Sequence, residues 1–206
     1  MLLALALVFL VAGLAALRID RRAVHYCREQ LARPLWRIAL RVTDWAKGLP
    51  WIVAALLFYA AVQAMMAWSG ETPVLRRISD YSLALLASFV AASVVLHGIK
   101  LFLGRRRPRD DFEHGLYGFR YFTWELQYDS FPSGHSMTIF CVAVVLSAIA
   151  PVLAPLWLIL ATGLALTRAM LTAHFFSDVL IGSAIGILVS RETFVLIFPQ
   201  LTPGWF

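Results

Sequence analysis

The sequence has few charged residues and few cysteines, and both shortages narrow the class of protein. Only 15% of its 206 residues are charged and 61% are hydrophobic, whereas a soluble domain has about a quarter charged residues. An ordinary soluble domain is therefore excluded, and the apolar residues are expected to form membrane spans. The two cysteines, Cys27 and Cys141, are too few and too far apart for a disulfide framework or a metal cluster.

Acidic residues are also scarce, with 12 Asp and Glu against 18 Lys and Arg. The positive charge gathers in two stretches, which hold eight basic residues in 18–47 and six in 100–120. Because these stretches flank apolar segments, nucleic acid is a poor candidate partner. The anionic headgroups and phosphates of membrane lipids are better candidates.

Apolar segments of about the length that a tilted helix needs to cross a bilayer occur at 2–17, 50–68, 81–103, 136–153, 155–172 and 177–199. Residues 19–48 alternate arginines with apolar residues. That pattern is typical of a helix lying in the membrane interface, with an ordinary loop helix as the alternative. We predict an all-α, six-transmembrane-helix bundle with an N-terminal interfacial amphipathic helix broken near Pro34. The chain is expected to be one membrane domain, with the first span and interfacial helix in 1–48 and the core spans in 49–206.

Counting crossings places three short polar clusters relative to the membrane. With six spans, segment 18–49, loop 104–134 and the turn at 172–176 all lie on one side of the bilayer. The clusters fall in or beside these stretches, although they are far apart in the sequence. They are therefore expected to converge on one membrane face.

The first cluster is Lys100 and Arg107, seven residues apart and followed by Pro108. Two turns of helix would put both side chains on nearly the same face, although Pro108 disfavours helix at Arg107. An ammonium and a guanidinium fork together suit a phosphate. The alternative is that Lys100 snorkels and that the arginines of 105–109 only mark the end of a span.

The second cluster is Ser133, Gly134 and His135, directly before an apolar segment. Ser133 is expected to cap a helix whose free backbone N–H groups suit an anion. Gly134 would permit close backbone approach, and His135 would stand in the first turn. A plain capped helix with an interfacial histidine is the alternative.

The third cluster is Arg168, His174 and Asp178. The last two are four residues apart, hence on one face if the helix has begun by His174. A carboxylate hydrogen-bonded to one ring nitrogen would fix the tautomer and aim the other nitrogen outward. A chain break within 170–175 would let Arg168 and His174 face a common centre. A purely structural His–Asp pair is the alternative.

Other residues are expected to be structural. His97, inside an apolar segment, is predicted to be a buried structural histidine, and Gly182 and Gly186 are predicted to allow close helix packing. The best metal candidates are weak ones in the loop: Asp110, Asp111 and Glu113. The same loop carries apolar and aromatic residues that could wall a headgroup pocket, enter the membrane or simply pack: Phe112, Leu116, Tyr117, Phe119, Tyr121, Phe122 and Trp124.

The three clusters read Lys-x6-Arg-Pro, Pro-Ser-Gly-His and Arg-x5-His-x3-Asp within 100–178. In that order they resemble the three signature motifs of the type 2 phosphatidic acid phosphatase (PAP2) superfamily. Thr167 stands where many members have Ser before the arginine. The resemblance implies a six-helix membrane core and a lipid phosphatase, a phosphoric monoester or diphosphate hydrolase. It further implies a phosphohistidine intermediate and no metal or other cofactor.

The resemblance also implies residue roles. His174 would be the nucleophile, Asp178 would orient it, and His135 would protonate the leaving oxygen. The residues similar to the family's phosphate cradle are Lys100, Arg107, Ser133, Gly134 and Arg168.

The expected partners are a lipid phosphate substrate and membrane lipids, and the sequence indicates no oligomeric state. Candidate substrates are phosphatidylglycerol phosphate, undecaprenyl diphosphate, phosphatidic acid and a lipid A phosphate. The alternatives are a lipid phosphotransferase that uses the same site and a non-enzymatic lipid-phosphate binding or transport protein. The positive-inside rule assigns the basic segments to the cytoplasm. The resemblance implies instead the periplasmic face of a bacterial inner membrane, and we expect the latter.

Overall fold

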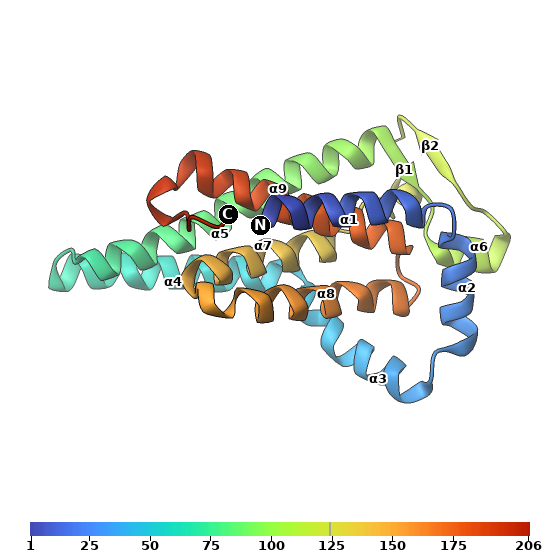
Figure 1. The fold of residues 1–206 in the computed structure, drawn as a ribbon, viewed down its shortest axis with the longest axis horizontal. Coiled ribbons are helices and arrows are strands. Elements are labelled where there is room, and N and C mark those ends of the chain that lie inside the picture. Colours follow the sequence, from blue (N-terminus) through green and yellow to red (C-terminus); the bar gives the residue numbers. More distant parts are fainter. Residues whose placement is uncertain (124) are drawn as a thin grey trace.

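The computed structural model describes residues 1–123 and 125–206, so Trp124 lies outside the described residues. Six helices of 15 or more residues fall on the predicted apolar segments and run alongside one another (Figure 1): α1 (Leu2–Ala16), α4 (Gly48–Ser69), α5 (Pro73–Phe102), α7 (Gly134–Ile149), α8 (Ala154–Met170) and α9 (Phe176–Ile197). The predicted helical membrane fold is confirmed. Short 3-10 turns η3 (Pro151–Leu153) and η4 (Pro199–Leu201) follow α7 and α9.

Not all of these helices are long enough to cross a bilayer alone. Among the described residues, four helices meet the length and hydropathy of a span. A fifth is added if α1 and α2 (Asp20–Gln30), bent by 87°, count as one broken span. Helix α7 has only 16 residues, against the ~20 that a span needs. The count of six spans therefore stays a prediction.

The outward faces of the helices are apolar. Leu57 in α4 is 67% exposed and Ile159 in α8 is 68% exposed, and α1 presents Val8 and Val11 in the same way. Contiguous exposed apolar surface of this kind is not found on soluble monomers and suits contact with lipid. The chain is an integral membrane protein.

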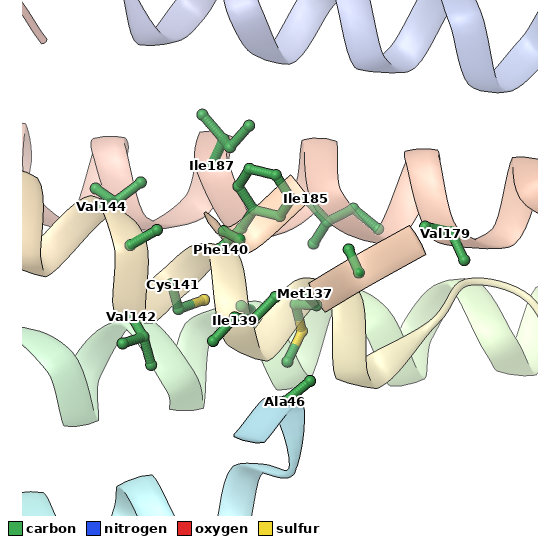
Figure 2. Packing of buried hydrophobic residues seen from close by; sticks show 14 of the residues in the cluster. Ala46, Met137, Ile139, Phe140, Cys141, Val142, Val144, Val179, Ile185 and Ile187 are labelled. Atoms are coloured by element: carbon green, nitrogen blue, oxygen red, sulfur yellow. The ribbon is translucent and has the colours of Figure 1, made fainter. Parts of the chain in front are cut away.

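Helix α7 forms the centre of the core. Its side chains pack against α9 and α5, and Phe140 and Val144 are fully buried (Figure 2). A Cβ on Gly182 or Gly186 of α9 would collide with the backbone oxygen of Ser133 or Met137. The prediction that these glycines allow close helix packing is confirmed, and α9 lies directly against the start of α7.

The N-terminal segment after α1 folds across one end of the bundle (Figure 1). It contains α2, α3 (Arg33–Val42) and η1 (Thr43–Ala46). The break that was predicted near Pro34 falls at residues 31–32, because Pro34 sits in the first turn of α3, where its missing N–H costs nothing. The position of these helices relative to a membrane interface stays a prediction.

The predicted all-α fold is not complete, because the structure also contains two short strands. β1 (Leu103–Arg105) pairs antiparallel with β2 (Phe119–Tyr121), followed by η2 (Leu126–Tyr128). Between the strands lies α6 (Pro108–His114). A Cβ on Gly104 would collide with the Thr123 side chain and lie 3.1 Å from the backbone oxygen of Arg120. A glycine is therefore needed here for close strand contact.

The three polar clusters do meet at one end of the bundle, as span counting predicted. The side chains of Asp20, at the start of α2, and Asp178, at the start of α9, both bind Arg105 of β1. At the opposite end, the Met1 amine donates to the backbone oxygen of Trp205 at 2.9 Å. Figure 1 shows α2, α6 and the two strands gathered at the first end.

Candidate active site

Lys100 and Arg107 meet at a residue that the sequence did not indicate, Asp129. The Lys100 ammonium donates to the backbone oxygen of Asp129. Arg107 binds its carboxylate through Nε and Nη2, at 2.7 and 2.9 Å. No helix joins this pair, because α5 ends at Phe102. Arg107 is extended (φ −79°, ψ 157°) ahead of Pro108, as the proline predicted. The two cations converge through the β1 turn instead.

The carboxylate between these cations is ionised. Burial raises the pKa of Asp129, but the Arg107 hydrogen bonds and charge, together with the Lys100 charge, outweigh this effect. The pKa of Asp129 therefore lies below its usual range. An anionic ligand of Lys100 and Arg107 has to compete with this carboxylate.

The second cluster forms the start of α7, as predicted. Ser133 is the N-cap and its Oγ accepts from the backbone N–H of Ser136 at 3.4 Å. Its own N–H donates to the backbone oxygen of Asp178 at 2.9 Å, which ties the second cluster to the third. Apart from its chain neighbours and the backbone of its own helix, no described atom lies within 4 Å of the place where a Cβ on Gly134 would be. His135, in the first turn, is half-buried and within electrostatic reach of Arg168 and His174.

Arg168 and His174 face a common centre because the chain breaks between them. Helix α8 ends at Met170 and α9 begins at Phe176, so the break predicted within 170–175 is confirmed. The turn contains Thr172 at φ +54°, a conformation that β-branched residues rarely adopt. The backbone oxygen of Arg168 accepts from the N–H of His174 at 3.2 Å.

The Arg168 guanidinium is hydrogen-bonded to a residue of the N-terminal segment, Thr43. Its Nη1 donates to Thr43 Oγ1 at 3.2 Å, and the hydroxyl oxygens of Thr43 and Thr167 lie 3.1 Å apart, within hydrogen-bond distance. Arg168 Nε is buried and has no hydrogen-bond partner in residues 1–123 and 125–206. The hydroxyl at position 167 thus has a structural function that serine or threonine can perform.

The imidazole of His174 is oriented by a backbone carbonyl. Its Nδ1 lies 2.8 Å from the backbone oxygen of Ser130. A carbonyl oxygen can only accept, so Nδ1 carries the proton and Nε2 keeps its lone pair. The ring is 3% exposed, so this orientation is fixed by packing as well.

The predicted hydrogen bond between Asp178 and His174 is wrong. His174 precedes α9, so the two residues do not share a helical face, and Asp178 Oδ2 lies 3.8 Å from Nδ1, too long for a hydrogen bond. The Asp178 carboxylate instead accepts from three donors: Arg105 Nη1 at 2.7 Å, Ser130 Oγ at 2.6 Å and the Phe175 N–H at 2.9 Å. Asp178 acts on the ring through its charge.

The environment favours the neutral form of His174. Burial lowers the pKa of His174, the Asp178 charge raises it, and the Arg107 and Arg168 charges lower it further, with a net shift below its usual value. A neutral imidazole with Nε2 unprotonated is the form that can act as a nucleophile.

The sequence did not indicate several residues of this site: Asp20, Thr43, Arg105, Asp129 and Ser130. In the alternative interpretation of the first cluster Arg105 only marks the end of a span, yet its side chain is fully buried. The sequence did offer indications for three of these residues. Asp20 is a single acid beside arginines after the first apolar segment, and Asp129 and Ser130 form an acid–serine pair directly before Phe131.

The remaining predictions have mixed outcomes. His97 is exposed and its Nδ1 contacts the backbone oxygen of Ser93 at 2.8 Å, so the prediction of a buried histidine is wrong. Asp111, a weak metal candidate, is bound by Arg21 at 2.8 Å and by His25 at 3.0 Å. The loop aromatics divide into two sets. Tyr117 and Phe119 pack around Arg105, whereas Tyr121 and Phe122 are 64% and 74% exposed.

Comparison with known proteins gives one consistent family. The family model described as the PAP2 superfamily matches residues 81–201. A lipid A 1-phosphatase from Rhizobium johnstonii is 28% identical over 167 residues, which are 74% of this chain and 68% of that protein. A lipid A 1-phosphatase from Rhizobium etli is 30% identical over 127 residues, which are 59% of this chain and 55% of that protein. The matches thus span about two thirds and just over half of these relatives.

A solved structure has a similar fold over the full chain. It is the crystal structure of the first transmembrane PAP2 type phosphatidylglycerolphosphate phosphatase from Bacillus subtilis. The TM-score is 0.59 at 20% identity, covering 100% of this chain and 98% of the other. At this identity the likeness concerns the fold alone.

Proposed function

Because this chain belongs to the PAP2 superfamily of phosphatases, we propose that it removes phosphate from a lipid phosphate or pyrophosphate through a phosphohistidine on His174, without a metal. The family match covers residues 81–201, which contain all three motifs. The class of reaction, hydrolysis of a phosphate ester, follows from the family. The covalent intermediate, the residue roles and the substrate are the proposed parts.

The observation that carries the proposal is the orientation of the His174 ring. With Nδ1 donating to the Ser130 carbonyl at 2.8 Å, the Nε2 lone pair is the free one. The neighbouring charges of Arg107 and Arg168 act on the same ring. A nucleophile beside fixed cations is the arrangement that phosphoryl transfer requires, since catalysis there is mainly positioning and charge stabilisation.

In the first step, His174 Nε2 attacks phosphorus while the bond from phosphorus to the leaving lipid oxygen breaks. His135, which takes up a proton when the phosphate dianion binds beside it, donates that proton to the leaving oxygen. The cradle stabilises the charge on the transferring oxygens, and its members are Lys100, Arg107, Arg168, Ser133 and the backbone N–H of Gly134. Arg168 Nε, which has no hydrogen-bond partner among the described residues, supplies a further donor to the phosphate.

In the second step, water attacks phosphorus, and the now neutral His135 takes the proton of that water. The phosphorus–nitrogen bond breaks, its electron pair returns to Nε2, and inorganic phosphate leaves. Nδ1 keeps its proton and its bond to Ser130 throughout. The Asp178 carboxylate, 3.8 Å from Nδ1, stabilises the positive charge that the ring carries while it is phosphorylated. General acid–base help of this kind contributes about 10²–10⁴-fold.

We place the acyl chains of the substrate in apolar cavities beside α4. A cavity of about 670 Å³ lies between α4, α5 and α7 and is lined by apolar side chains such as Phe58 and Leu85. A smaller cavity of about 400 Å³ shares Trp51 and Ala54 with it and reaches Asp44. Asp44 directly follows Thr43, which holds Arg168. The shared lining of the two cavities and the position of Asp44 support a headgroup at the cations with its tails in the bilayer.

Among the candidate substrates, we propose a lipid A phosphate first, because both curated relatives described above are named lipid A 1-phosphatases. The test is phosphate release by the purified protein from four lipids: phosphatidylglycerol phosphate, undecaprenyl diphosphate, phosphatidic acid and lipid A. The His174→Ala variant is the negative control, and His114→Ala, an exposed loop histidine, is the matched control that keeps activity. Fastest release from lipid A supports the assignment, and release from none of the lipids overturns the function.

Two further outcomes would contradict parts of the proposed reaction. Strong inhibition by EDTA that Mg²⁺ reverses would contradict the metal-free mechanism. A new phospholipid formed without free phosphate would identify a phosphotransferase.

We also propose that the site lies on the periplasmic face of a bacterial inner membrane. The test uses Cys27→Ser to remove the half-exposed native thiol, with Cys141 left buried. Arg109→Cys then places one thiol on an exposed position of the loop, since that side chain is 68% exposed. Labelling by an impermeant maleimide in intact spheroplasts supports the periplasmic face, and labelling only after lysis places the site in the cytoplasm.

A further inference from the structure

Arg105 is a guanidinium buried completely beside the candidate active site. Its Nη1 donates to Asp178 Oδ1 and to Ser177 Oγ, both at 2.7 Å. Its Nη2 lies 2.9 Å from Asp20 Oδ2 and 3.0 Å from the Tyr117 hydroxyl. A charge without solvent is costly unless it is paired and hydrogen-bonded, and here two carboxylates share it.

Aromatic rings complete the enclosure. The guanidinium carbon lies 4.1 Å from the ring centre of Phe175 and 4.8 Å from that of Phe119. Phe175 also donates its backbone N–H to Asp178. The rings fix the plane of the guanidinium, and hence the direction in which it holds the carboxylate.

Asp20 brings the N-terminal segment into this arrangement. Its side chain is fully buried at the start of α2, and it accepts from the backbone N–H of Ser177 at 3.0 Å and from the Ser177 hydroxyl. Asp20, Arg105 and Asp178 form a row of two carboxylates and one guanidinium, which carries a net charge of −1 when both acids are ionised. Without Asp20, the positive charge of Arg105 would cancel that of Asp178.

We propose that Asp20 and Arg105 are positioning residues for the Asp178–His174 pair, so that helix α2 completes the active site. Arg105 fixes the Asp178 carboxylate in place, and Asp20 offsets the guanidinium charge so that Asp178 still acts on His174 as an anion. This inference rests on the proposed function, because it assigns both residues to the same reaction.

The test is Asp20→Asn, which keeps size and removes the charge. We expect kcat to fall about 10- to 100-fold, with KM within about threefold of wild type, because the substrate does not contact Asp20. The acid limb of the pH–rate profile is expected to move to lower pH, because His174 loses nearby negative charge. The other groups that act on His174 are unchanged in this variant: Arg107, Asp129, His135, Arg168 and Asp178.

The matched control is Asp111→Asn. Asp111 is also a buried carboxylate that anchors α2, through Arg21 and His25, but it does not touch Asp178. If docking of α2 were the only function of Asp20, the two variants would lose kcat equally at equal thermal stability. We expect Asp111→Asn to lower the melting temperature and to keep the wild-type kcat and acid limb.

A rescue variant and a direct titration of His174 test the same charge effect in two further ways. Asp20→Asn combined with Arg105→Gln restores the net charge of −1 and is expected to recover part of the acid limb. NMR titration of ring-labelled histidine in micelles reads His174 without any substrate, so a failure of the proposed function leaves this measurement intact. An unchanged His174 titration and an unchanged kcat in Asp20→Asn would overturn the inference, whereas an inactive wild type would overturn only the proposed function.

Discussion

Replacing Asp178 with asparagine separates two functions that a carboxylate beside a histidine can have, setting the tautomer and stabilising positive charge. In this structure the Ser130 carbonyl binds Nδ1 at 2.8 Å, and the carboxylate is 3.8 Å away. We therefore expect Asp178→Asn to keep the Nδ1–H tautomer and to lose only the charge.

The size of that loss follows from the distance. A unit charge pair 3.8 Å apart is worth about 4 kcal/mol at an effective dielectric constant near 20, which corresponds to about 10³-fold in rate. Arg105 on the same carboxylate offsets part of this charge, so a kcat loss of about 10²- to 10³-fold is expected. When the aspartate of a serine protease triad also sets the tautomer, the same substitution costs about 10⁴-fold.

The assay is a ¹⁵N spectrum of histidine-labelled protein in micelles, in which protonated and unprotonated ring nitrogens give separate signals. His174→Gln assigns the His174 resonances. Asp111→Asn serves as the positive control, because Asp111 does contact an imidazole directly, His25 Nε2, at 3.0 Å. Its substitution should therefore change the His25 signals. An Nε2–H signal for His174 in Asp178→Asn would refute the reasoning.

Three other predictions concern the same end of the bundle. His174→Ala is expected to leave less than about one-thousandth of wild-type phosphate release, as loss of a nucleophile should; higher residual turnover would exclude it as nucleophile. Burial lowers the pKa of His174, so the acid limb of the kcat/KM profile should have its midpoint below about pH 6.5. A midpoint above that pH would contradict a neutral nucleophile. Gly182→Ala and Gly186→Ala should each destabilise the protein by about 1–3 kcal/mol by overpacking against α7, measured as thermal unfolding in micelles. Only Gly182→Ala should also lower kcat, because its Cβ displaces Ser133, and equal kcat in the two variants would argue against that turn as part of the cradle.

The sequence predicted the parts of the fold that depend on hydrophobic length. A run of apolar residues has few alternatives in a membrane protein, so the helices fall on the predicted segments, and the common face of the clusters follows from counting them. The small sheet could not be predicted in this way. Its strands have three residues each, and Gly104 is required by contacts with Thr123 that are distant in sequence.

The site shows the same limit at the level of residues. Spacing predicted Arg168, His174 and Asp178 as one group, and they are one. It left open whether α9 has begun by His174. The helix begins only at Phe176, so Nδ1 binds the Ser130 carbonyl instead of Asp178. Arg105 and Asp20 are separated by 85 positions, and only the packed structure brings Asp20, at the start of α2, to the arginine that binds Asp178.

Ser130 binds the two central residues through different parts of itself, its carbonyl to His174 and its hydroxyl to Asp178. An alanine scan would therefore detect only half of this residue's contribution. Ser130→Ala deletes the hydroxyl and leaves the carbonyl in place, so a mild phenotype at this position would say nothing about the contact that orients the His174 ring. That contact is made by the main chain, and it can be examined only by changes that move the backbone, such as altered pairing with β1, where the Ser130 N–H donates to Arg105.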